Sequence, residues 1–279
     1  MNKVISKKTH RLLNKKNLSI CLISSCLILF IIFCLVFHLF NKKVFSVESR
    51  IEEVSNFELL DDSSDFETIG WLRIQGTSID YPIIYTSKDV DSFPVEIENF
   101  VWSVNSDTHF HNQINIIGHN IFNLSSQPLM HSEEFHRFEE LMDFVYYDFA
   151  KENQHIQLTI DGEDYVYKVF AVEFVRTADI VDIGMNLPDD YINAHLQEHI
   201  DYLNTNSMYD YDIDVNNQDS IIILNTCTRF FGTDPQYDFI VAGRLVRDGE
   251  SYANVRISKN DSYQDIENIL KGDDENENS

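Results

Sequence analysis

The sequence predicts a mainly β protein whose strands close into an eight-stranded barrel, with helices in some connections and a transmembrane helix at the N-terminus. Short runs of branched aliphatic and aromatic residues recur along residues 66–250, separated by turn-forming residues. Closure into a barrel is the simplest arrangement, because it removes the exposed edges of an open sheet. The N-terminal prediction depends on residues 18–40, an apolar run without Asp, Glu, Lys or Arg.

The first 65 residues are predicted to attach the chain to the cell membrane. The apolar run contains 23 residues, enough for a helix to cross a bilayer. Residues 1–17 hold six Lys or Arg residues and only two follow the run, so a cytoplasmic N-terminus and an extracellular folded domain are expected. A cleaved signal peptide is the competing interpretation, but the run is too long and no small-residue cleavage site follows. Residues 41–65 are predicted to form a membrane-proximal, helical segment.

The charge distribution excludes nucleic acids as partners. The formal net charge is −25, although residues 1–47 contain eight Lys or Arg residues and no acid, so the remainder is strongly acidic. We expect no cofactor and no metal ion, because His109 and His111 lack a third ligand at suitable spacing. Residues 251–279 are predicted to form an acidic, largely disordered tail.

The domain at residues 66–250 is predicted to contain strands and two helices. Strands are expected at residues 69–74, 79–85, 100–104, 113–118, 155–160 and 165–172. Apolar residues at three- and four-residue spacing predict a helix at residues 132–151. Pro188 opens a second predicted helix, whose apolar face carries Ile192, Leu196, Ile200 and Leu203.

The last part of the domain is predicted to contain two buried strands and a nucleophile. Four branched aliphatic residues precede Asn225, Thr226 and Cys227, and a second β-rich run follows at residues 238–246. Cys227 therefore lies at a strand end, where a rigid element holds the thiol and a loop-lined opening admits substrate. The other three cysteines lie in the apolar N-terminal run, so Cys227 has no intramolecular disulfide partner.

Three motifs follow one another along the predicted strands: Gly118-His119-Asn120, Thr226-Cys227 and a final strand at residues 240–245. Together with the N-terminal run, they resemble the sortases, membrane-anchored cysteine transpeptidases of Gram-positive bacteria with an eight-stranded barrel. Residues 70–82, residues 165–172 and the helix-bearing insertion at residues 188–206 resemble class B sortases in particular. The resemblance covers residues 66–247 and implies a sortase-type barrel.

The resemblance implies that Cys227 is the nucleophile and His119 its acid–base partner. A thiol is a weak nucleophile until it loses its proton, and a neighbouring imidazolium favours the thiolate. From the residues alone, Cys227 also fits a small buried apolar residue and His119 an ordinary loop residue. Thr226, Asn225 and Asn120 flank the pair and are expected to bind substrate.

The expected third catalytic residue departs from the family pattern. Sortases usually place Arg just before the apolar run of the last strand, and this chain has Asp238 there. Arg244 lies six residues farther on, roughly 20 Å along an extended strand, which is too far for a substitute. Arg229 is therefore the candidate, and an ion pair with Asp238 would place its guanidinium near the Cys227 thiol.

The predicted function is that of a class B-like sortase. Cys227 cleaves a C-terminal sorting motif of a secreted surface protein or pilin, and an amine resolves the resulting thioester. The amine belongs to a cell-wall precursor or, in a pilus-polymerising variant, to a pilin lysine, and the sequence leaves both open. A second hypothesis, motivated by the missing Arg, is a catalytically impaired, membrane-tethered peptide-binding module with the same fold.

Overall fold

The computed structural model describes residues 67–85, 101–103, 112–120, 138–160, 162–185, 187–232 and 236–276. All of them belong to the second of the two units into which the chain divides, which begins at Glu53. The predicted cytoplasmic segment, transmembrane helix and membrane-proximal segment lie outside the described residues, as do His109 and His111. Within the described ranges, none of the helices has the length and apolar character needed to span a membrane.

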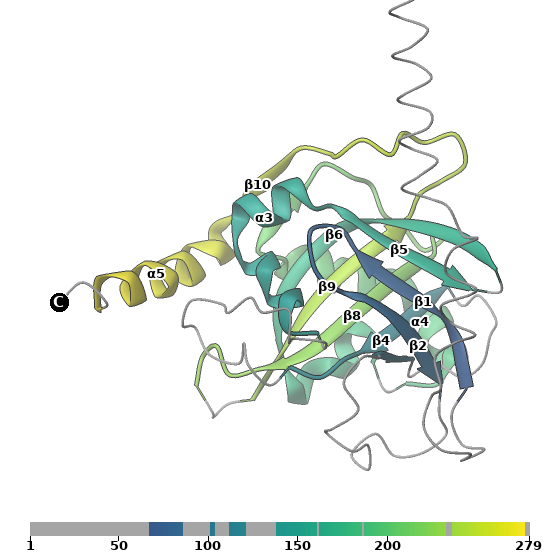
Figure 1. Ribbon diagram of the computed structural model, residues 1–279, viewed down its shortest axis with the longest axis horizontal. Helices are drawn as coiled ribbons and strands as arrows, with labels where there is room; N and C mark the ends of the chain where they lie inside the picture. Colours follow the sequence, from purple (N-terminus) through teal and green to yellow (C-terminus); the bar gives the residue numbers. More distant parts are fainter. Residues whose placement is uncertain are drawn as a thin grey trace, which may run out of the picture. The chain divides into compact units, whose positions relative to one another are not determined.

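Each strand predicted from the sequence is present in the structure. The strands of the main sheet are β1 (Glu67–Ile74), β2 (Asp80–Tyr85), β3 (Val101–Ser103), β4 (Gln113–Ile117), β5 (His155–Ile160), β6 (Glu163–Arg176), β8 (Ile221–Thr228) and β9 (Tyr237–Leu245). Their order is β1-β2-β3-β4-β8-β9-β6-β5, and β5 pairs with β1 again, so the hydrogen-bonded ladder closes. Strands β8 and β9 pair with each other and lie side by side (Figure 1). The predicted mainly β class with helices in the connections is confirmed.

Side chains alternate along the strands and build two apolar cores. Leu72, Leu224 and Val241 belong to the larger core, which gathers residues from seven strands of the ladder and fills the barrel interior. Ile223 and Ile240 point the other way and join a second core on the outer face. The outer face of β8 is therefore covered by protein along most of its length, and Cys227 lies on this face, two residues beyond Asn225.

The outer core is covered by the 3₁₀ helix η3 (Thr177–Ile183) and the helix α4 (Asp189–Asn206). The predicted helix after Pro188 is confirmed, because the four apolar residues of its predicted face are all buried. Gly184, at φ 77°, ends η3, and a Cβ atom there would overlap the Gln113 side chain of β4. Gln113 Nε2 donates to the carbonyl of Ile183 at 2.8 Å, and Asn115 Nδ2 to that of Gly184 at 3.0 Å. The end of η3 is thus held against β4 by these two hydrogen bonds.

The helix predicted at residues 132–151 is divided into two shorter elements in its described part. A 3₁₀ helix, η2 (Phe138–Val145), precedes the short helix α3 (Tyr147–Glu152). The hydroxyl of Tyr209 donates to the carbonyls of Phe144 and Val145, at 3.1 and 2.8 Å. These tertiary hydrogen bonds occupy carbonyls that a continuous helix would use for its own ladder. The prediction of one continuous helix is therefore wrong.

The prediction of a largely disordered tail is also wrong. Strand β10 (Ile257–Lys259) pairs with β7 (Tyr209–Tyr211), and the helix α5 (Asp261–Asn276) follows, drawn in yellow (Figure 1). Ile257, Tyr263 and Ile266 are buried in the main core. The last two are three residues apart, which is helical spacing. The prediction was based on the acidic composition of this segment, whereas its few apolar residues anchor it to the core.

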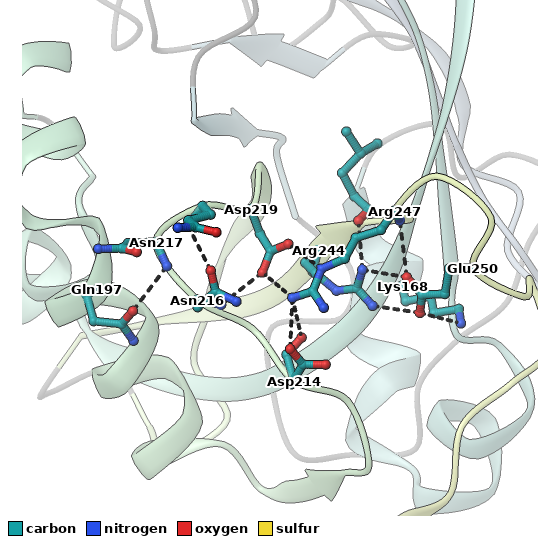
Figure 2. A network of polar contacts seen from close by, with 11 residues as sticks. Lys168, Gln197, Asp214, Asn216, Asn217, Asp219, Arg244, Arg247 and Glu250 are labelled. Atoms are coloured by element: carbon teal, nitrogen blue, oxygen red, sulfur yellow. Dashed lines mark hydrogen bonds and ion pairs between the residues drawn. The ribbon is translucent and has the colours of Figure 1, made fainter.

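A network of ion pairs fastens the chain after β9 (Figure 2). The guanidinium of Arg244 binds both carboxylate oxygens of Glu250, at 2.6 and 2.7 Å, and Lys168 Nζ binds the same group at 3.0 Å. Arg247 makes two hydrogen bonds with Asp219, at 2.7 and 2.8 Å. Arg244 is 1% exposed, so its charge requires these partners.

Candidate active site

Strand β4 carries His119 to the end of β8. The two strands are parallel, with Ile117 paired to Asn225, and the N–H of Gly118 donates to the carbonyl of Asn225 at 3.1 Å. Paired residues of a ladder share one face, so continuing this register by two residues places His119 beside Cys227. The structure thus brings together the two segments that hold the predicted nucleophile and acid–base residue.

Hydrogen bonds fix the position of both segments. Thr226 Oγ1 donates to the carbonyl of Gly118 at 2.8 Å, and Asn120 Nδ2 donates to that of Cys227 at 3.1 Å. The thiol of Cys227 lies 3.6 Å from the carbonyl oxygen of Asn120, within range of a weak S–H donor bond. Thr226 and Asn120 are both buried. Their side chains join the two strands and position the thiol, and their contact with substrate stays a prediction.

The Cys227 thiol is accessible but not activated by its surroundings. Cys227 is exposed, whereas its neighbours Thr226 and Thr228 are buried. Nearby protein atoms nevertheless exclude enough water to raise the pKa of the thiol, and the charge of Asp238 raises it further. A hydrogen bond from the Asn120 backbone and the charge of Arg229 act in the opposite direction. The thiol therefore needs a base, and half-buried His119 is the candidate beside it.

Asp238 lies directly opposite Cys227 in the β8–β9 ladder. Its carboxyl group accepts a hydrogen bond of 2.6 Å from Thr177 Oγ1 and another from the side chain of Asn225. Burial raises the pKa of Asp238, and the two hydrogen bonds partly offset this effect. Asn225, predicted to bind substrate, is buried and serves to orient Asp238.

The predicted ion pair between Arg229 and Asp238 is not formed. Among the described residues, the carboxyl group of Asp238 has only neutral hydrogen-bond partners. Arg229 is exposed beyond the end of β8, where its carbonyl accepts from the N–H of Gly232 at 2.8 Å and closes a turn. Asp238, by contrast, is held within the sheet face. Arg229 thus acts on the thiol only through its charge.

An aromatic cluster supports the loop that follows Cys227. The Phe174 ring lies 4.9 Å from the rings of Phe230, Phe231 and Phe239, centroid to centroid. Phe231 also contacts Tyr237 at 4.8 Å and remains 36% exposed. These rings hold the turn that carries Arg229, and Phe231 presents an apolar surface to solvent.

Two residues near the site, Thr177 and Glu173, were not identified from the sequence. Thr177 follows the end of β6, and only the pairing of β6 with β9 brings its hydroxyl to Asp238. Glu173 lies on the same outer face, opposite Ile240. No local pattern marks either residue. Within the described ranges there is also no group of three or more His, Cys, Asp or Glu side chains arranged to hold a metal ion.

Comparison with known proteins connects this arrangement to one family. Residues 72–246 match the family profile described as the Sortase domain. A mutant form of Clostridium perfringens sortase B is similar in structure, with a TM-score of 0.55, 18% identity, and coverage of 72% of this chain and 90% of that one. A Staphylococcus aureus sortase B–substrate complex has a TM-score of 0.55 and 17% identity, with coverage of 76% of this chain and 91% of that one. Sortase B from the type II pilus of Streptococcus pneumoniae has a TM-score of 0.50 and 22% identity, with coverage of 64% of this chain and 92% of that one. Comparison with curated protein sequences found no match.

Proposed function

Because this chain belongs to the sortase family of cysteine transpeptidases, we propose that Cys227 and His119 transfer an acyl group from a sorting motif to an amine. The observation that carries this assignment is the register of β4 on β8, which pairs Ile117 with Asn225, two residues before His119 and Cys227 respectively. Asn120 strengthens it by bonding directly to the nucleophile's backbone. Cys227 is exposed, and a nucleophile that attacks a peptide must be accessible to it.

The first step forms a thioester. The Cys227 thiolate attacks the scissile peptide carbonyl, the C–N bond breaks, and His119 gives its proton to the leaving amine. Backbone N–H groups, with the charge of Arg229, stabilise the oxyanion of the tetrahedral intermediate. An incoming amine then attacks the thioester and releases Cys227. The two residues follow or end the adjacent strands β4 and β8, which supports a short distance between the reacting groups.

The substrates are secreted surface proteins or pilins with a C-terminal sorting motif. The fold shared with a Staphylococcus aureus sortase B–substrate complex supports a peptide substrate of class B type. The acceptor is a primary amine, supplied by a cell-wall precursor or by a pilin lysine. The two acceptors present the same nucleophile to the thioester, and in vitro transfer to each distinguishes them.

The catalytic domain works outside the cell, held by a single N-terminal membrane span with a cytoplasmic N-terminus. The apolar run at residues 18–40 and the Lys and Arg residues before it support this location. Protease added to intact, wall-stripped cells should digest the domain. Protection of the domain until the cells are lysed would refute the topology.

The test of function is capture of the acyl-enzyme. The full-length chain is incubated with peptides from the C-terminal regions of surface proteins of its own bacterium, and mass spectrometry locates the adduct. We expect a thioester on Cys227 and none in Cys227→Ala. Peptide binding that is unchanged in Cys227→Ala, with no adduct in the wild type, would instead support the catalytically impaired binding module.

A further inference from the structure

Asp238 lies beside the position at which a nucleophile would attack a thioester on Cys227. Residues directly opposite in an antiparallel pair have Cβ atoms about 5 Å apart, so the Asp238 carboxyl borders the reacting sulfur. Asp238 is 8% exposed, and a charge so poorly hydrated interacts strongly with its neighbours. The position next to the nucleophile therefore carries a negative charge in a site whose oxyanion needs positive charge.

The Asp238 carboxyl keeps binding capacity after its contacts within the protein. Thr177 and Asn225 orient it with one hydrogen bond each. An ionised carboxyl group has about four lone-pair positions, so about two remain. Both partners are neutral and leave the charge uncompensated. Arg229, the cation whose charge reaches the thiol, lies in the turn beyond the strand.

We propose that Asp238 binds the ammonium group of the acceptor amine beside the Cys227 thioester and takes one proton from it. This inference rests on the proposed function and specifies its second step. A primary amine of lysine type has a pKa of about 10.4 and is protonated at neutral pH, so it must lose a proton before it can attack. A buried carboxylate attracts the cation, and its burial favours acceptance of the proton.

The protons and bonds of this step balance. The ammonium group R–NH₃⁺ gives one proton to Asp238, and the nitrogen lone pair forms a bond with the thioester carbonyl carbon. The tetrahedral intermediate collapses, the C–S bond breaks, and Cys227 leaves as a thiolate. The nitrogen gives its second proton to His119, which became neutral when it protonated the first leaving amine. The product is an amide, and Asp238 then loses its proton to water.

The same placement gives a preference for amines over water. Once the thioester has formed, the negative charge of Asp238 repels hydroxide and other anionic nucleophiles from the thioester carbonyl. An ammonium group removes this repulsion when it binds, whereas water does not. The thioester is thus protected from hydrolysis until the acceptor arrives.

The cation site can be tested without knowledge of the sorting motif. In the full-length chain, Cys227 is modified with a cationic reagent, 2-aminoethyl methanethiosulfonate, and with an anionic one, 2-sulfonatoethyl methanethiosulfonate. Cys227→Ala supplies the background from the other cysteines. The ratio of the two rates cancels the intrinsic reactivity of the thiol. We expect Asp238→Asn to lower the cation-to-anion ratio by at least about tenfold, the scale of one charge at this distance.

Asp182→Asn is the matched control, because it removes a negative charge from η3 that acts on His199 and Tyr202. It should leave the ratio within about twofold, since an exposed charge is screened. Thermal melting confirms that the variants are folded. An unchanged ratio in folded Asp238→Asn would overturn the ammonium site.

The proton transfer is tested by acetylating Cys227 with p-nitrophenyl acetate and following release of the acetyl group. Glycinamide presents an ammonium group, whereas hydroxylamine is neutral near pH 7. Asp238→Asn should slow transfer to glycinamide by about 10²-fold and transfer to hydroxylamine by no more than about threefold. Equal slowing with both nucleophiles would overturn the proposed proton acceptor.

This design separates the two hypotheses. A thioester that resists every amine would refute the proposed function, and the proton transfer with it. The reagent ratio measures only the attraction of a cation to the thiol, so it decides the ammonium site whatever the outcome of the transfer reaction.

Discussion

The two ends of strand β9 both place a charged side chain on the outer face of the sheet, but only one of these charges has an ionic partner among the described residues. Arg244, opposite Ile221, is enclosed by Glu250 and the segment that follows the strand (Figure 2). Asp238, opposite Cys227, meets only the neutral groups of Thr177 and Asn225 among the described residues. One strand thus carries a compensated cation at one end and an uncompensated carboxyl at the other.

The two charged residues have different roles: Arg244 contributes to stability, whereas Asp238 is able to take part in the chemistry of the site. A buried charge costs several kcal/mol of desolvation, which only close, well-aligned partners offset. Around Arg244, the Glu250 carboxylate and the carbonyl of Leu245 bind the two terminal nitrogens of the guanidinium, so its charge is compensated within the protein. The Asp238 carboxyl is oriented but not neutralised, and it can respond to a substrate cation. The experiments below perturb this contrast, beginning with the largest expected effect.

Removal of Glu250 should destabilise the fold without changing the thiol. In Glu250→Ala, Arg244 and Lys168 lose their shared carboxylate, and breaking a buried ion pair costs about 3–5 kcal/mol of unfolding free energy. Because these cations hold the pKa of Glu250 far below its ordinary value of 4.5, the contribution is present above that pH and is lost as the pH falls. Urea unfolding measures the effect.

Asp212→Ala is the control for that experiment, because it breaks an exposed ion pair with Arg256. It should cost no more than about 1 kcal/mol. The contrast between the two ends of β9 would fail if Glu250→Ala instead changed the reactivity of Cys227 and left the stability unaltered.

Glu173 should make the stability fall as the pH rises. It lies opposite Ile240 in the middle of β9, is 1% exposed, and within the described residues neither of its carboxyl oxygens has a hydrogen-bond partner. Burial raises its pKa from 4.5 to about 8. Between these values the unfolded chain is ionised while the folded chain retains the proton, so folding becomes less favourable with increasing pH.

The wild type should therefore lose about 3–4 kcal/mol of stability from this group between about pH 5 and pH 8, since each pH unit between the two pKa values costs roughly 1.4 kcal/mol. Glu173→Gln should remove that loss, because an amide does not titrate. Urea unfolding of both proteins at the two pH values gives the comparison. Identical pH dependence would show that Glu173 is ionised in the folded protein.

Replacement of His119 should affect the rate and not the fold. We expect His119→Ala to slow acyl-enzyme formation by at least about 10²-fold, the lower end for loss of acid–base catalysis. Its unfolding free energy should change little, since His119 is only half-buried. Mass spectrometry of the Cys227 adduct over time provides the rate. Near-normal transfer in this variant would remove His119 from the mechanism.

Arg229 should give the smallest effect. Its charge lowers the pKa of Cys227 from an exposed position, so Arg229→Ala should reduce the rate by about tenfold, and less at high salt. Arg229→Lys retains the charge and should be close to normal. A loss of about 10² to 10³ that does not respond to salt would instead indicate a direct hydrogen bond to the oxyanion.

The sequence by itself determined the strands of the main sheet and the α4 helix, and it pointed to Cys227 and His119 as candidate reacting residues. Strand and helix periodicities are local properties, and the amphipathic face of α4 could be identified because its four apolar residues recur at helical spacing. Cys227 and His119 were singled out because the motifs that contain them, Thr226-Cys227 and Gly118-His119-Asn120, follow predicted strands in an order that resembles the sortases. From the residues alone, both positions stayed open.

The tertiary structure decided the other features, because they depend on contacts between residues far apart in the sequence. Tyr209 divides the predicted helix at Val145, 64 positions away, and the acidic C-terminal segment is ordered by a core to which few of its residues contribute. Thr177 reaches Asp238 across 61 positions and takes the place that sequence proximity had given to Arg229. Local patterns fix which elements form, whereas the partners of a buried charge are chosen only when the strands pair.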